Sequence, residues 1–173
     1  HLESQAGRRL RGASLKDIER AKREVWGNRL VRLTFRAKKE VEARGEYLAL
    51  TTSIVEASQT QAQAAELLLA TMVVGAWRTI RQHVYLFARL EVFVAKFGVP
   101  GESVFPCRAS TLVKYLLHLK DFGIRPSVPS SVKASVIWIP RRLQLPLQQL
   151  LDTPLVDAIA SSVAEEKAAR FDD

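Results

Sequence analysis

The fold is decided by residues 76–98, which read AWRTIRQHVYLFARLEVFVAKFG. Apolar residues recur there three or four positions apart, as on one face of an α-helix. These residues are Ile80, Val84, Phe87, Leu90, Val94 and Phe97. The opposite side carries three cations and no acid, in the series Arg78, Gln82, Tyr85, Arg89 and Lys96. The pattern predicts a helix from about Trp77 to Phe97, with one side in a core and a basic side exposed.

Helical patterns also lie on both sides of this segment. Residues 59–77, rich in alanine and glutamine and then strongly apolar, predict a largely buried helix. Residues 111–122 predict another helix, capped by Ser110, with an apolar face made by Leu112, Val113, Leu116, Leu117 and Leu119. Gly98 marks the end of the helix predicted at 77–97, and Gly123 marks the end of the helix predicted at 111–122.

The C-terminal third predicts two more helices. Residues 132–139 include the β-prone run SVIWI, but Ser130 or Ser131 can cap a helix here, and Pro140 would end or kink it. Thr153 before Pro154 has the pattern of an N-cap followed by a first-turn proline. The apolar line of that last helix would be Leu155, Ile159 and Val163.

Residues 1–60 have a different character, because positive and negative charges alternate along them as on a solvated helix. Ser14 with Asp17 resembles a weak capping box, and Gly27 with Asn28 is a candidate break. We therefore predict an all-α protein. A helical arm over residues 1–60 precedes a compact bundle of four to five helices over residues 61–173.

Composition points to an acidic partner. The 173 residues are 47% hydrophobic and 25% charged, as in ordinary globular proteins, and the net charge is +8 with a pI of about 10. Residues 76–145 hold 11 Lys/Arg and 3 Asp/Glu, a net charge of +8, whereas residues 146–173 hold 2 and 6. A basic surface on a folded domain favours nucleic acid or anionic lipid as the partner.

Several other classes of function are disfavoured. No glycine-rich phosphate loop and no metal-ligand spacing is present, so we expect no cofactor, no metal site and no catalysis by this chain alone. The single cysteine, Cys107, suits an intracellular setting: the nucleus of a eukaryote, or the cytoplasm and nucleoid of a bacterium. The apolar run at 67–77 is too short for a membrane span, and we expect no membrane partner. The first residue is His1 and the only methionine is Met72, so we expect a piece of a longer protein.

Two groups of residues are candidates for binding nucleic acid. The basic side of residues 77–97 offers arginines for phosphates, and Thr79 lies in the first turn, where helix N–H groups also hold phosphate. A second group lies near the predicted helix at 132–139, with Arg125, Ser131 and Lys133 at its start and Arg141 and Arg142 after it. The alternatives are a solvated face and simple serine capping. We expect His83 to be a partly buried structural residue, and Trp77 and Trp138 to belong to the core.

The order of these pieces resembles the core-binding domain of tyrosine recombinases and phage-type integrases, a SAM-like helical domain. WRTIRQHVYLFARLEVFV resembles its first helix, STLVKYLLHLKDFGIRPSVPSSVKASVIWI the next part, and LQLPLQQLLDTPLVDAIASSV the closing segment. The likeness covers about residues 76–165. His83 stands where that helix usually has an aromatic residue, and Pro140 departs from the pattern of the third helix.

The resemblance implies that the domain forms half of a clamp around duplex DNA during site-specific recombination or DNA integration. The residues that it carries over are Thr79, Arg81, Gln82, Ser131 and Lys133. The family's catalytic Arg, Lys, His-x-x-Arg and Tyr pattern is not found in this sequence, so a C-terminal catalytic domain would supply the chemistry. A homo-oligomer on DNA is a further expected partner.

The sequence therefore predicts a duplex-DNA-binding domain. The predicted DNA-binding residues are Arg78, Thr79, Arg81, Gln82, Arg89, Arg125, Ser131, Lys133, Arg141 and Arg142. Gln82 and Lys133 are the candidates for contacts with base edges. Two alternatives stay open: a helical protein-interaction module without nucleic-acid binding, and a domain that binds RNA.

Overall fold

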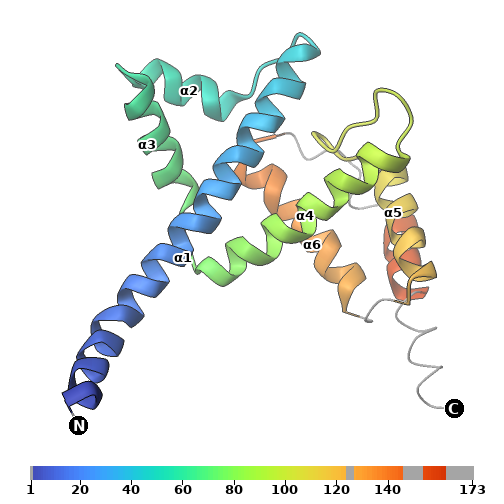
Figure 1. Ribbon diagram of the computed structural model, residues 1–173. Coiled ribbons are helices and arrows are strands. Elements are labelled where there is room, and N and C mark those ends of the chain that lie inside the picture. Colours follow the sequence, from blue (N-terminus) through green and yellow to red (C-terminus); the bar gives the residue numbers. More distant parts are fainter. Residues whose placement is uncertain (1, 124–126, 146–153, 163–173) are drawn as a thin grey trace, which may run out of the picture.

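Helices account for most of the described chain. The computed structural model describes residues 2–123, 127–145 and 154–162, with side chains from residue 14 onward. The helices are α1 (Leu2–Ala43), α2 (Ala49–Ala57), α3 (Gln61–Met72), α4 (Trp77–Phe97), α5 (Ala109–Asp121) and α6 (Val128–Arg142), and residues 154–162 are also helical (Figure 1). Within these ranges the only β-structure is an isolated bridge between Val104 and Cys107. The all-α prediction is confirmed.

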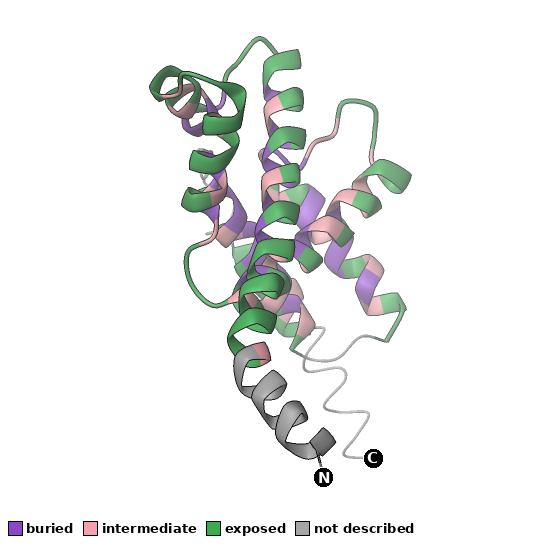
Figure 2. Ribbon diagram, turned by 60° about the vertical axis from the view of Figure 1, so that its left-hand side comes forward, coloured by how far each residue is buried: buried purple, intermediate pink, exposed green. Residues whose placement is uncertain are grey.

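Helix α4 is the centre of the fold, and it packs against both α1 and α6. Its bounds agree with the predicted helix, and Ile80, Val84, Phe87 and Leu90 are buried as the apolar spacing indicated. The residues of the predicted apolar line are less buried in the last turn, where Val94 is half-buried and Phe97 is 61% exposed. Phe97 contacts the rings of Phe93 and His118 at the surface instead of entering the core. Figure 2 shows the buried positions gathered where the helices cross.

Helix α1 differs from the predicted arm in two ways. It runs without interruption through Ser14 and through Gly27–Asn28, so the predicted cap and the predicted break are both wrong. Its C-terminal half also belongs to the common core, to which it contributes Leu30, Leu33, Ala37 and Val41. Residues on both sides of the domain boundary predicted at residue 60 therefore pack in the same core. The N-terminal part of α1 does extend beyond the other helices (Figure 1).

Gly27 has a packing role rather than a helix-breaking one. A Cβ atom at this buried position would lie 2.3 Å from Val73 Cγ2 and 3.3 Å from Leu69 Cδ1. Real carbon contacts are rarely below about 3.5 Å, so only glycine lets the end of α3 approach α1 this closely. The glycine allows two backbones to approach without interrupting a helix.

Helix α3 is shorter and more exposed than predicted. It starts at Gln61 because the Thr60 side chain caps it, accepting a hydrogen bond of 3.1 Å from the Gln63 N–H. Leu68 and Met72 are its buried residues, and α1 and α2 are the helices that pack most extensively against it. The expectation of a largely buried helix is wrong. The chain then turns through Gly75, whose φ of +97° favours glycine.

The serines do not cap α5 and α6 as predicted. Ser110 lies inside α5, whose N-cap is Arg108, without a side-chain hydrogen bond. Helix α6 begins earlier than expected, with Pro129 in its first turn, a position that suits proline. Ser130 and Ser131 each donate a 3.0 Å hydrogen bond from Oγ to the Ser127 carbonyl.

The end of α6 and the last helical segment also differ from expectation. Helix α6 continues through the buried Pro140 to Arg142, so this proline does not end it. In residues 154–162, Val156 is fully buried while Leu155 is 55% exposed, so the predicted apolar line is wrong in its first residue. Ile159 packs against the core as predicted. Thr153 and Val163 lie outside the described residues.

Candidate nucleic-acid interface

Helix α1 crosses the start of α4 at a cluster of indole rings and cations. Lys22 Nζ lies 4.5 Å from the centre of the Trp77 ring, and the Arg78 guanidinium carbon lies 5.2 Å from it. One cation comes from α1 and the other from α4. An aromatic face attracts a cation, worth about 0.5–1 kcal/mol at an exposed site, so the ring holds both side chains at this crossing.

The same arrangement is repeated one turn further along α1. The Arg29 and Arg81 guanidinium carbons lie 4.4 Å and 5.7 Å from the centre of the Trp26 ring. Trp26 and Trp77 are both half-buried, so each indole packs inward while its cations stay at the surface. The crossing therefore presents four cations to solvent beside two aromatic rings.

The C-terminal end of α6 adds two arginines. Arg142 lies with its guanidinium carbon 4.5 Å from the centre of the Trp138 ring, and its Nη2 donates a 3.3 Å hydrogen bond to the Val74 carbonyl, just before α4. Arg141 and Arg142 line a hollow of about 490 Å³ together with His83, Ala134, Ile137 and Trp138. We name Lys22, Arg29, Arg78, Arg81, Arg141 and Arg142 the basic junction.

His83 fixes the geometry beside this hollow. Its ring stacks on Trp138, with centroids 4.8 Å apart and planes 16° apart, and its Nδ1 lies 2.9 Å from Ser135 Oγ. Burial, and next the charge of Arg142, lower the pKa of His83, so the ring is neutral at neutral pH. His83 is half-buried and structural, as expected from its place on the helix. Trp77 and Trp138 were expected in the core. Both are half-buried with cations over their rings, and Trp138 packs against the core.

The basic junction brings together six cations that have no acidic partner among the described residues. None of the six forms an ion pair in the described part of the chain, and Glu24 is the only acid in residues 22–29, 74–83 and 134–142. Elsewhere, Arg36 pairs with Glu91 at 2.9 Å. Unpaired exposed cations can neutralise phosphates without first breaking an internal pair, and they release condensed counterions when they do so.

The start of α4 adds backbone donors at the same place. Its N-cap, Ala76, makes no side-chain capping hydrogen bond. Thr79 and Gln82 are exposed on the first two turns, next to Arg78 and Arg81. The first N–H groups of a helix attract anions, so this end suits a phosphate flanked by arginines.

The structure separates the predicted site residues into groups. Arg78, Arg81, Arg141 and Arg142 come together in the basic junction, with Thr79 and Gln82 beside them.

The remaining predicted residues are placed differently. Arg89 is exposed further along α4 and donates a 2.8 Å hydrogen bond from Nη1 to the Tyr85 hydroxyl. Ser131 bonds to the Ser127 carbonyl, and Lys133 is ion-paired with Asp157, so both have partners within the chain. Arg125 lies outside the described residues.

The contribution of α1 to the basic junction was not predicted. Lys22, Trp26 and Arg29 are spaced four and three residues apart, which places an aromatic ring between two cations on one helix face. That spacing was a usable signal. The prediction of a separate arm over residues 1–60 did not bring these residues to the start of α4.

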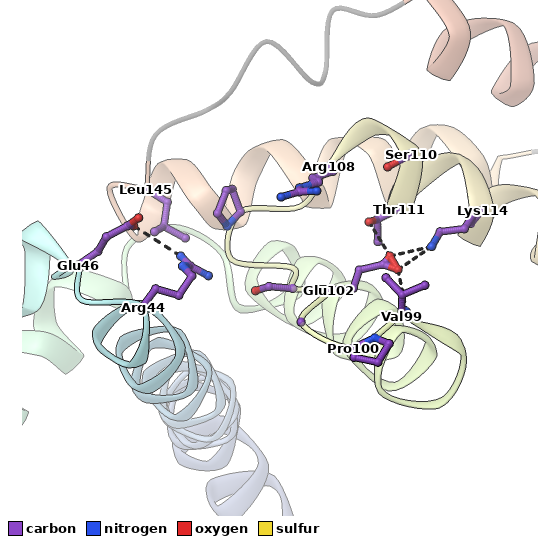
Figure 3. Close-up of a pocket in the computed structure, with 13 residues that line it drawn as sticks. Arg44, Glu46, Val99, Pro100, Glu102, Arg108, Ser110, Thr111, Lys114 and Leu145 are labelled. Carbon is purple, nitrogen blue, oxygen red and sulfur yellow. Dashed lines mark hydrogen bonds and ion pairs between the residues drawn. The ribbon is translucent and has the colours of Figure 1, made fainter.

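A second cavity, of about 540 Å³, lies among the loop after α4, the start of α5 and the end of α1 (Figure 3). Its charged groups are largely engaged with each other. Lys114 Nζ bonds both carboxylate oxygens of Glu102, at 2.6 and 2.8 Å, and Thr111 Oγ1 donates to Glu102 at 3.0 Å. The bond from Lys114 is the main cause that lowers the pKa of Glu102, so its carboxylate is ionised and held in place. Arg44 donates a 2.6 Å bond to the Phe105 carbonyl.

The described residues contain no activated cysteine and no metal-binding cluster. Burial raises the pKa of the Cys107 thiol to about 12, so it stays protonated at neutral pH. No group of three or more His, Cys, Asp or Glu residues in the described ranges could hold a metal ion. Among those same residues, no helix combines the length and hydrophobicity needed to cross a bilayer.

Comparisons with known proteins leave the family of this chain open. No protein-family model matches it, and neither the curated proteins nor the solved structures include a significant match.

Proposed function

We propose that this chain is a helical domain that holds duplex DNA by its phosphates at the basic junction. The observation that carries the proposal is the gathering of six cations without ion pairs, drawn from three helices, beside an uncapped helix start. Arginine and lysine supply most of the affinity of proteins for nucleic acid through phosphate contacts, and such contacts position a protein without reading sequence.

The resemblance of residues 76–165 to the core-binding domain of tyrosine recombinases supports the choice of duplex DNA over RNA. In this proposal the domain positions DNA for recombination or integration, and a catalytic domain elsewhere performs the chemistry. The protein would then act in the nucleus of a eukaryote or at the nucleoid of a bacterium. Gln82, exposed beside Arg81, is the candidate for a contact with a base edge.

The test is a titration of the protein against a labelled duplex of random sequence at several salt concentrations. Six phosphate contacts predict that log K falls against log salt with a slope of about −5 or steeper. The variant Arg78→Ala/Arg81→Ala should make the slope shallower by about two. No binding of duplex at low salt would refute the proposal, and tighter binding of structured or single-stranded RNA would assign the surface to RNA instead.

A matched control removes the same charge away from the basic junction. Lys39 and Arg108 are exposed, form no ion pair in the described part of the chain, and lie on the second half of α1 and at the start of α5. Lys39→Ala/Arg108→Ala should leave the salt slope near that of the unaltered protein. If the control and the junction variant weaken binding equally, net charge rather than a defined surface explains the affinity.

A protein-interaction module is the second candidate, favoured by an apolar hollow of about 340 Å³ formed by α1, α2 and α3. Phe35 and Val55 line it and are 50% and 60% exposed, with Leu68 at its base. Exposed apolar surface of this kind is typical of contact sites. Failure of the protein to bind either duplex DNA or RNA at low salt would make this surface the first candidate.

A further inference from the structure

The N-terminal part of α1 forms a second basic surface, outside the basic junction. Figure 1 shows this end of α1 extending past the helices that pack on its other half, and every residue from 15 to 25 is exposed. Lys16, Arg20 and Arg23 follow one another at intervals of four and three residues. At 3.6 residues per turn their Cα atoms fall within about 60° around the helix axis, so they form one stripe.

The three cations of this stripe have no partner among the described side chains. None of Lys16, Arg20 and Arg23 makes an ion pair or a side-chain hydrogen bond in the described part of the chain. The acids of the segment, Asp17, Glu19 and Glu24, lie about 70–90° around the helix from the middle of the stripe. The stripe is therefore a line of positive charge with acids only at its edges.

The stripe leads to the basic junction. The next residue in its line is Gly27, four positions after Arg23, where the end of α3 touches α1 through Val73. The adjacent residue, Val74, accepts the hydrogen bond from Arg142 of the basic junction. Cations therefore continue from the protruding end of α1 across the contact at Gly27 to the end of α6.

We propose that Lys16, Arg20 and Arg23 bind the phosphate backbone of the same duplex beyond the basic junction and so lengthen the bound site. This inference rests on the proposed function. The stripe offers only lysine and arginine, with no Asn or Gln along its line, so it adds affinity and register without adding sequence preference. From Lys16 to Gly27 the helix rises about 16 Å, which matches about five base pairs at a rise of 3.4 Å.

The experiment measures affinity against duplex length and against salt. The full chain, the variant Lys16→Ala/Arg20→Ala/Arg23→Ala and the control Lys39→Ala/Lys96→Ala/Arg108→Ala are each titrated with random-sequence duplexes of increasing length. In the unaltered protein, affinity should rise with length until the duplex spans both surfaces. The stripe variant should reach its plateau with duplexes about five base pairs shorter, and its salt slope should be shallower by about three. The control should retain both values.

The outcomes separate this inference from the proposed function. If the stripe variant keeps the plateau length and salt slope of the control, the stripe does not contact DNA, while the basic junction can still be tested through Arg78 and Arg81. If the unaltered protein binds no duplex, both proposals fail together. A loss of self-association in the stripe variant, with DNA binding unchanged, would overturn the inference and assign the stripe to a protein contact. Unchanged helical content by circular dichroism shows that the variants fold.

Discussion

Replacing Gly27 with alanine tests the close contact between α1 and α3. The new Cβ would lie 2.3 Å from Val73 Cγ2, more than 1 Å inside an ordinary carbon contact, and 3.3 Å from Leu69 Cδ1. The end of α3 or the Val73 side chain must move to relieve this overlap. Extra volume forced into a packed contact costs about 1–3 kcal/mol.

A second effect acts in the opposite direction and sets the net magnitude. Alanine is more favourable than glycine inside a helix by about 1 kcal/mol. We therefore expect Gly27→Ala to lower the free energy of unfolding by about 1 kcal/mol, within a range of about 0–2 kcal/mol. Val73→Ala removes the Cγ2 methyl group that the new Cβ would overlap. The double variant Gly27→Ala/Val73→Ala therefore keeps the higher helix propensity of alanine without the overlap with Val73.

Urea unfolding followed by circular dichroism gives the free energies for the two single variants and the double variant. The coupling energy between the two sites should be about 1–3 kcal/mol, with the double variant more stable than the sum of the single effects. The reasoning would be refuted if Gly27→Ala alone stabilised the protein by about 1 kcal/mol with no coupling to Val73. The glycine would then lie at an open site.

Three further predictions concern single side chains. Arg36→Ala should lower the free energy of unfolding by about 1 kcal/mol or less in urea, because its two hydrogen bonds of 2.9 Å to Glu91 form an ion pair exposed on the arginine side. Cys107 should react with iodoacetamide only slowly until urea exposes it, because burial raises its pKa to about 12. The pKa of His83 is lowered from its ordinary 6.5, so near that pH the folded state binds fewer protons than the unfolded state. The contribution of His83 to the free energy of unfolding should therefore be present above pH 6.5 and decrease below it. Urea titrations at a series of pH values measure this decrease, and His83→Gln should abolish it.

The sequence was sufficient for α4 and for the fold class. A line of large apolar residues at regular spacing, with cations opposite, leaves few alternatives to an amphipathic helix. The buried line of α1 was harder to see because it includes the small Ala37 and is surrounded by charges, although Trp26, Leu30, Leu33, Ala37 and Val41 follow the same spacing. Its place in the core depends on packing against α4 and α3, not on its own composition.

Glycine and serine residues, which often mark helix ends, were the main source of error in the local predictions. Gly27 looked like a break because glycine weakens helices, but a contact with Val73, 46 positions away, explains it. Ser110 and Ser131 looked like caps because serine favours that position. Each helix instead begins a little earlier, so both serines fall inside a turn. Whether a serine caps a helix or lies within its first turns depends on where the preceding loop joins the helix.

The composition of the basic junction could be predicted only in part. Arg78 and Arg142 are 64 residues apart in sequence, and only the crossing of α4 and α6 brings their ends together. The sequence also could not separate free cations from engaged ones. Lys133 looked equivalent to Arg81, yet it pairs with Asp157, 24 residues later, while Arg81 lies over the Trp26 ring.

The three tryptophans of the chain, Trp26, Trp77 and Trp138, each lie under at least one cation of the basic junction. A phosphate that attracts those cations changes the electric field at the indole rings, because the positive charge moves relative to the ring face. The tryptophan emission of the protein thus comes entirely from the proposed contact surface. Its wavelength and intensity report on occupancy without an attached dye, and a ligand bound only at the apolar hollow beside Phe35 would leave the emission nearly unchanged.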